Sequence, residues 1–231
     1  MPHTKSRKKI YFYLFILLLL SSTFNFNIIS KFNKLNLINH IKITGLSEIE
    51  KSELENKLSI FIKKNIFLIS KEEVDIIIKE NNYIDTYKIK KIFPSKLLVS
   101  IKKTKFIGRT ILDGKKYYIG QNGKLTQLSL FKQEFNLPQV FGSFKAKDFI
   151  KLQEILYLNG FNLNDIDKYY YFKSDRWDIK NKDSVTLKLP SKNIEKSLKN
   201  YKSLLKSNKI IQGQLIDLRM ENKIIFTDAK K

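Results

Sequence analysis

The sequence predicts an α+β protein with one N-terminal transmembrane helix, a small β-α-α-β-β unit and a mostly antiparallel β domain that carries two helices. Three observations predict this fold class. An uncharged apolar run lies near the N-terminus, amphipathic helical patterns lie between strand-like segments in residues 40–104, and short alternating segments with turn residues dominate the remainder.

The N-terminal segment predicts a membrane anchor. Residues 1–9 carry four positive charges and no acidic residue, and residues 10–30 are uncharged. A helix over 10–29 would be long enough for a hydrocarbon core of about 30 Å at a rise of roughly 1.5 Å per residue. The basic tail predicts a cytoplasmic N-terminus, with residues 30–231 exported. A cleaved signal peptide is the alternative, because the densest apolar stretch, 10–20, has the length of a signal-peptide core.

A linker at 30–39 leads to the first exported unit, expected over 40–104. The segment "HIKITG" alternates as a strand does and ends at a glycine, and two helical patterns follow it. Each helix opens with a predicted capping box, Ser47 with Glu50 and Ser70 with Glu73. Two strand-like runs joined through "FPSK" complete the unit, so we expect both helices on one face of a three-stranded sheet.

The second region is expected over 105–228, before a short tail at 229–231. Turns are predicted at Asp113-Gly114 and at Asn122-Gly123. One helix is expected over 147–158, and a second helix is expected to be capped by Ser191. The chain then closes with the strand patterns "QLIDLRM" and "KIIFT" around a turn at Glu221-Asn222.

The formal net charge of +22 permits binding to polyanions. However, the lysines are scattered, no four are consecutive, and no nucleic-acid-binding motif accompanies them. We therefore expect no specific binding to nucleic acid. A secreted or anchored basic protein that binds nucleic acid or an anionic wall polymer remains the alternative function class.

No catalytic or cofactor motif is present. The chain has no cysteine and two histidines, and the HExxH, GxSxG and P-loop patterns are absent. Four aspartates, Asp165, Asp167, Asp175 and Asp178, lie around a predicted strand pair, where a solvated strand edge explains them. The sequence therefore predicts a protein that is not an enzyme and has no cofactor and no metal site.

Several segments together resemble the FtsQ/DivIB family of bitopic cell-division proteins, over essentially the whole chain. The segments are "IKITG", "YKIKKIFPSKLLVSIKKTKFIGR", "YYIGQNGKL", "LPQVFG", "RWDIKNKDSVTLKLP" and, as the most specific, "IDLRMENKIIF". The chain departs from the family pattern at Gln121, where an acid is usual, at Asp183, where a turn glycine is usual, and at Met220, where an aromatic is frequent.

The resemblance implies a scaffold of the division septum in the inner membrane, with its exported part in the periplasm. It implies a POTRA domain at 40–104 that recruits other divisome components, and a C-terminal β domain at 105–228. The last strands of that domain would bind FtsB/FtsL-like partners. The implied contact residues are Arg176, Ile216, Asp217, Leu218, Arg219 and Met220.

Arg219 is one of only four arginines among 44 basic residues. In a strand, Asp217 and Arg219 would share one face while Ile216, Leu218 and Met220 would share the other. An arginine binds a carboxylate through a planar fork, which a lysine cannot do. That carboxylate could belong to a partner, or Arg219 could pair within the chain with Asp217 or a cross-strand acid. Trp177, the single tryptophan, is expected in the core.

Overall fold

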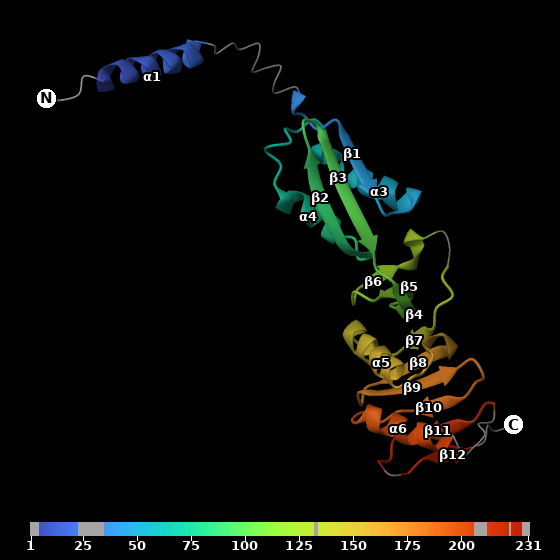
Figure 1. Ribbon diagram of the computed structural model, residues 1–231. Coiled ribbons are helices and arrows are strands. Elements are labelled where there is room, and N and C mark those ends of the chain that lie inside the picture. Colours follow the sequence, from blue (N-terminus) through green and yellow to red (C-terminus); the bar gives the residue numbers. More distant parts are fainter. Residues whose placement is uncertain (1–4, 23–34, 132–133, 206–211, 222, 228–231) are drawn as a thin grey trace. The chain divides into compact units, whose positions relative to one another are not determined.

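The computed structural model describes residues 5–22, 35–131, 134–205, 212–221 and 223–227. The chain divides into two compact units, as Figure 1 traces along the sequence. Residues 1–80 and 87–102 form the first unit, and residues 81–86 and 103–231 form the second.

The N-terminal run forms helix α1 (Lys5–Ser22), whose apolar side chains from Ile10 to Leu20 are exposed. Among the described residues, no helix is both long enough and apolar enough to cross a membrane. The span predicted over 10–29 is therefore not confirmed. The helix begins within the basic segment, since lysine and arginine are good helix formers. Residues 23–29 lie outside the described part.

The first unit contains helices α3 (Glu48–Leu58) and α4 (Lys71–Lys79), with the short helix η1 (Ser59–Phe61) after α3. Both helices begin where the capping residues predict. The Ser47 N–H and hydroxyl donate to Glu50 Oε2 at 3.0 and 2.8 Å. The Ser70 Oγ accepts the Glu73 N–H at 3.1 Å. Each serine thus satisfies or orients polar groups that a helix N-terminus leaves open.

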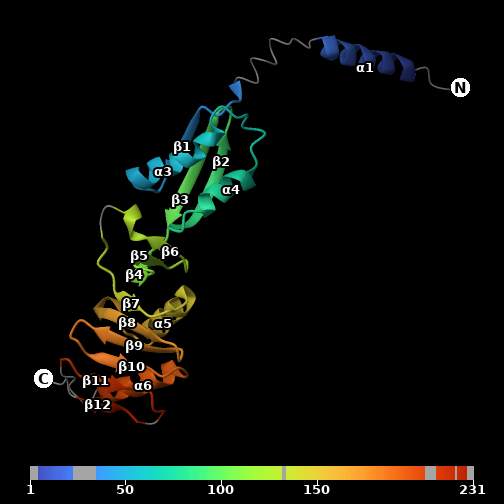
Figure 2. The same ribbon diagram turned by 180° about the vertical axis from the view of Figure 1, so that it is seen from behind.

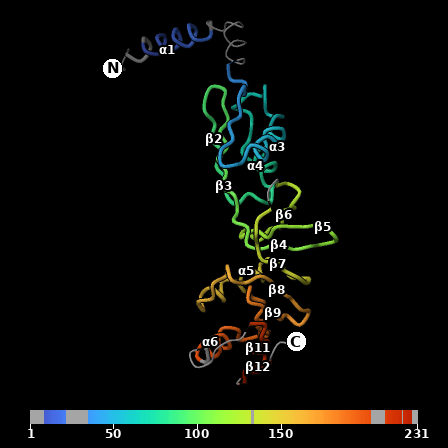
Figure 3. Tube along the Cα trace, turned by 90° about the vertical axis from the view of Figure 1, so that its right-hand side faces the viewer, coloured from blue at the N-terminus to red at the C-terminus, as the bar shows by residue number. Residues whose placement is uncertain are grey.

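Strands β1 (His40–Thr44), β2 (Ile84–Ile92) and β3 (Lys96–Lys103) form a three-stranded sheet in the order β1-β3-β2. β1 pairs in parallel with β3, and His40 lies opposite Lys96. Figure 3 shows α3 and α4 on the same side of these strands. The predicted β-α-α-β-β arrangement is therefore confirmed. Its core contains Ile41, Ile43, Leu54, Leu58, Phe61, Val74, Ile78, Leu97, Val99 and Ile101.

The second unit is built on a nine-stranded sheet in the order β12-β11-β10-β9-β8-β7-β4-β5-β6. Its pairs are antiparallel except β4–β7, β7–β8 and β10–β11. The β4–β5 hairpin turns at Asp113 and Gly114, both with positive φ, as a tight hairpin requires. The strands are β4 (Phe106–Leu112), β5 (Lys115–Gly120), β6 (Leu125–Gln127), β7 (Gln139–Phe141), β8 (Ile166–Phe172), β9 (Arg176–Asn181), β10 (Thr186–Lys188), β11 (Leu215–Asp217) and β12 (Ile225–Thr227).

Helices α5 (Ala146–Leu158) and α6 (Ile194–Leu205) lie on the same side of this sheet, as Figures 2 and 3 show. Their apolar faces meet the inward side chains of the strands around Trp177, which is buried as predicted. The core members include Phe149, Leu152, Leu156, Tyr169, Ile179, Val185, Leu187, Leu189, Leu198, Tyr201, Ile216 and Leu218. The opposite face of the sheet carries no described helix (Figure 3).

The start of α6 differs from the prediction that Ser191 caps this helix. The helix begins at Ile194, directly after Asn193, whose φ of 57° is left-handed. Asparagine adopts this conformation more readily than most residues, so it can end the preceding bend where Ser191 lies.

Candidate functional site

The segment predicted to carry the contact residues lies at one end of the nine-stranded sheet. β11 runs parallel to β10, with Ile216 opposite Leu187. One residue beyond β11, the Leu218 N–H still donates to the Lys188 carbonyl at 2.9 Å. Ile216 and Leu218 are both buried in the core beneath the helices. Their side chains therefore fix the position of this segment and face the core rather than solvent.

Met220 does not share their environment. It lies in a bend after Leu218 and is 57 % exposed. The prediction that Ile216, Leu218 and Met220 form one strand face is therefore wrong at Met220, because the strand ends at Asp217. Glu221 then pairs with Lys196 of α6 at 3.1 Å, which links the turn to the helix layer. Asn222, the second residue of the predicted turn, lies outside the described residues.

Arg219 and Asp217 form a bidentate pair within the chain. The Arg219 Nε donates to Asp217 Oδ1 at 2.8 Å and to Oδ2 at 2.9 Å, and Nη2 also donates to Oδ2. The Arg219 backbone N–H adds a bond to Oδ1 at 3.0 Å. These hydrogen bonds lower the pKa of the Asp217 carboxyl and raise the pKa of the guanidinium. Of the two interpretations of Arg219, the one in which it pairs within the chain with Asp217 therefore describes the structure.

A row of charges crosses three neighbouring strands on the sheet face away from the helices. Lys188 of β10 lies opposite Asp178 of β9 on one side and opposite Asp217 of β11 on the other. Asp178 is 5 % exposed, so burial raises the pKa of its carboxyl, while Arg176, Lys188 and Arg219 oppose that shift. The expectation that Asp178 lies at a solvated edge is therefore wrong.

Arg176 extends the same row. Its Nε donates to Asp178 Oδ1 at 3.3 Å, and its guanidinium lies 4.2 Å from the centroid of the Phe172 ring. A planar guanidinium that stacks on an aromatic ring can still donate hydrogen bonds from the N–H groups along its edge. The structure thus brings the two predicted arginines to one charged row, although they are 43 residues apart in sequence (219 − 176).

β12 is an edge strand of the described sheet. It pairs only with β11, through the register Leu215 to Thr227, Ile216 to Phe226 and Asp217 to Ile225. All three of its residues are exposed, including the large apolar side chains of Ile225 and Phe226. Within the described part of the chain, one side of its backbone therefore has no strand partner, so its N–H and C=O groups are open next to apolar side chains.

The sequence drew attention to Asp178 only as one of four aspartates near a strand pair, and it did not single out Lys188, Ile225 or Phe226. The spacing of Arg176 and Asp178 mirrors that of Asp217 and Arg219. This i, i+2 repetition is the signal that could have placed β9 and β11, which both neighbour β10, on one charged surface. Lys188 carried no signal, because its position depends on the register between strands that are distant in sequence.

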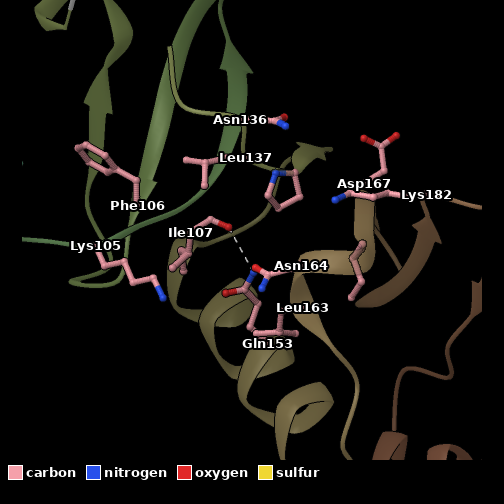
Figure 4. A pocket seen from close by; sticks show the side chains of 12 residues that line it. Lys105, Phe106, Ile107, Asn136, Leu137, Gln153, Leu163, Asn164, Asp167 and Lys182 are labelled. Atoms are coloured by element: carbon pink, nitrogen blue, oxygen red, sulfur yellow. Dashed lines mark hydrogen bonds between the residues drawn. The ribbon is translucent and has the colours of Figure 1, made fainter. Parts of the chain in front are cut away.

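The charged row is separate from the pocket in Figure 4, which lies in the same unit between β4, α5 and β8. This pocket has a volume of about 360 Å³ and contains none of the predicted site residues. Gln153 crosses it to donate to the Ile107 carbonyl at 3.3 Å. Across the described residues, no group of three or more histidine or acidic side chains could hold a metal ion.

Two family matches cover most of the chain. The family described as "POTRA domain, FtsQ-type" matches residues 36–103, and "Cell division protein FtsQ/DivIB, C-terminal" matches residues 110–219. The second match ends at Arg219 and includes every predicted contact residue except Met220.

A curated relative is also described as a cell-division protein. "Cell division protein FtsQ" of Bradyrhizobium diazoefficiens is 20 % identical over 194 residues, which cover 81 % of this chain and 56 % of the relative. The chain thus spans a little over half the length of that protein. A solved structure, the major extracytoplasmic domain of the trans isomer of the cell-division protein DivIB from Geobacillus stearothermophilus, is 14 % identical, with a TM-score of 0.33. That match covers 47 % of this chain and 99 % of the solved chain.

Proposed function

Because the chain belongs to the FtsQ/DivIB family of cell-division proteins, we propose that it is a non-enzymatic scaffold of the division machinery. In this role it binds FtsB/FtsL-like division proteins through the end of the nine-stranded sheet. The observation that carries the proposal is the open edge of β12 beside the charged row of Arg176, Asp178, Lys188, Asp217 and Arg219.

Strand addition is the binding mode that this edge supports. An extended partner segment would pair with the open backbone groups of β12, while Ile225 and Phe226 would contact alternate partner side chains. Main-chain hydrogen bonds give such an interface affinity with little dependence on sequence. The neighbouring charges would then provide its selectivity.

The charged row suits an acidic partner segment. It holds three basic and two acidic side chains, Arg176, Lys188 and Arg219 with Asp178 and Asp217, so one positive charge is left over. The fork that Arg219 forms with Asp217 uses its Nε and Nη2, and arginine has five N–H donors in all. Asp217 would hold the guanidinium in place, so that the remaining donors can meet a partner carboxylate at a small entropic cost.

We place the protein in the inner membrane at the division septum, with a cytoplasmic N-terminus and residues 30–231 in the periplasm. The support is the basic tail at 1–9 followed by the uncharged residues 10–30. The first exported unit would recruit other divisome components, in keeping with its match to an FtsQ-type POTRA domain.

The binding site is tested by reversing the charge of Arg219. Tagged full-length protein and its Arg219→Glu variant are captured from detergent-solubilised membranes, and the co-eluting proteins are identified by mass spectrometry. We expect the wild type to retain FtsB/FtsL-like proteins through a moderate salt wash. The amount of these proteins that co-elutes with Arg219→Glu should be at least tenfold lower. A tenfold loss corresponds to about 1.4 kcal/mol of binding free energy.

Two matched variants make this result specific. Lys199→Glu makes the same charge change on an exposed residue of α6, on the helix side of the sheet, and should bind normally. Arg219→Lys keeps the charge and removes the planar fork, so its binding should be intermediate. Normal capture by a folded Arg219→Glu protein would contradict the site. Recovery of only salt-sensitive polyanions by the wild type would favour the alternative that the net charge of +22 suggests.

A further inference from the structure

The first unit has an exposed apolar tip that the proposed partner site does not use. Phe67 and Phe93 stack with their ring centroids 4.8 Å apart and are 57 % and 55 % exposed. Leu68, which follows Phe67 in the sequence, is 81 % exposed, and Ile92, which precedes Phe93, is exposed as well. Single exposed apolar residues are common on protein surfaces, but a contiguous cluster of large apolar side chains in solvent indicates an interaction surface.

Both segments that form this tip are rich in lysine. The two segments that form it, 60–71 and 90–96, contain three lysines each and no acidic residue. The side chains of Lys63, Lys64, Lys90 and Lys96 are exposed, while Lys91 donates to the Ile69 carbonyl at 2.6 Å and ties the two segments together. An apolar centre with a basic rim complements the headgroup region of an anionic bilayer.

The tip also lies where the chain enters the unit. The Ile38 N–H donates to the Lys64 carbonyl at 2.9 Å, the Ile66 N–H to the Asn36 carbonyl at 2.9 Å, and the Asn39 N–H to the Ser95 carbonyl at 3.0 Å. The entering segment is therefore bonded to both halves of the tip. Only residues 23–34 separate it from α1, so an extended connection reaches roughly 45 Å at most.

We propose that this tip contacts the surface of an anionic lipid bilayer, with Phe67, Leu68 and Phe93 at headgroup depth and the lysines on acidic headgroups. The tip thereby sets the height and the tilt of the first unit above the membrane. The inference rests on the membrane anchoring in the proposed function, and it assigns a lipid contact to residues outside the partner site.

The absence of native cysteine allows a direct test on the full-length chain. Leu68→Cys is labelled with the environment-sensitive dye NBD, and the protein is reconstituted into vesicles of phosphatidylcholine with or without phosphatidylglycerol. With phosphatidylglycerol, the emission of the dye should shift to the blue and be quenched by doxyl groups near the lipid headgroups. Ile76→Cys on α4, an exposed residue of the same unit, is the matched control and should show neither change.

The contribution of charge is tested in the same assay. Each lysine near an anionic surface contributes roughly fivefold to binding. The Lys90→Gln/Lys96→Gln double variant should therefore lower the ratio of bound to free tip roughly 25-fold. Vesicles of phosphatidylcholine alone should weaken the contact in the same direction.

A third labelled position, Leu17→Cys in α1, separates this inference from the anchoring on which it rests. If the dye is quenched at 17 and unchanged at 68, the anchor stands and the tip contact is overturned. If neither position is quenched, both are overturned. Quenching at 68 without quenching at 17 supports the tip and contradicts the anchor. A blue shift at 68 that lipid doxyl groups do not quench indicates a protein contact and overturns the proposal.

Discussion

Asp217 and Arg219 explain why an arginine stands here in a chain whose other basic residues are almost all lysine. The carboxylate accepts three side-chain hydrogen bonds from one guanidinium and one from the backbone. A lysine could supply only a point charge. The two interpretations left open by the sequence are thus compatible, because a guanidinium held by an internal carboxylate still has donors to offer.

Removing the charge of Asp217 should lower stability in a pH-dependent way. The folded state lowers the pKa of this carboxyl, so its contribution is complete above the unfolded value of about 3.9 and is lost as the pH falls through the folded value. Asp217→Asn should reduce the free energy of unfolding at pH 7 by about 0.5–1 kcal/mol, since solvent screens the partly exposed Arg219. Denaturant unfolding at pH 7 and pH 3 measures this difference.

Asp178→Asn is the matched substitution, and its effect on stability should have the opposite sign. Burial raises the pKa of Asp178 in the folded state, so its ionised form is the less favourable one there. The variant should be as stable as the wild type or more stable at pH 7, and this advantage should shrink as the pH falls and Asp178 takes up a proton. A variant at position 178 that loses stability at pH 7 while the one at 217 does not would contradict the electrostatic assignment of the row.

At the scale of elements, the sequence predicted those that depend on local signals. The capping residues Ser47 and Ser70 mark the starts of α3 and α4, and Asp113-Gly114 marks the first hairpin. The strand at β11 was predicted, but its end at Asp217 and the exposed position of Met220 were missed for a different reason. The alternation of "LIDLRM" continues past the point where the strand ends, because bends and strands can share the same residue pattern.

The capping serine of α4 should contribute measurably to stability. Ser70→Ala removes the oxygen that accepts the Glu73 N–H and should lower the free energy of unfolding of the first unit by about 1 kcal/mol. Ser52→Ala is its control, as an exposed position inside α3, where alanine favours the helix slightly. Thermal unfolding followed by circular dichroism compares the two. Equal effects would show that Ser70 does not act as a cap.

At the scale of the molecule, the order of the nine strands could not be predicted from the sequence. β4 lies between β5 and β7, and β10 lies between β9 and β11, through parallel pairs whose partners are far apart in the chain. No local pattern specifies such pairs, and they bring Arg176 and Arg219 together. The candidate contact residues could therefore be named from the sequence. The role of Lys188, the place of Asp178 beside it and the open edge of β12 became visible only in the sheet.

The charged row and the edge strand form one continuous surface. Asp217 belongs to the row and is also the residue opposite Ile225 of β12. A partner strand on β12 would therefore lie one strand away from the Arg219 fork. In the proposed complex, one short segment would use main-chain pairing and a charge contact together, which would favour a specific complex over general attraction to polyanions.

Hydrogen exchange of the two sheet edges in the complex tests the central claim most directly. Full-length protein is compared alone and with its FtsB/FtsL-like partners, and the exchange of amides in β12 (Ile225–Thr227) is followed beside that in β6 (Leu125–Gln127), the opposite edge of the same sheet. Strand addition predicts slower exchange in β12 on binding and unchanged exchange in β6. A formed complex in which β12 exchanges as fast as in the free protein would contradict the account.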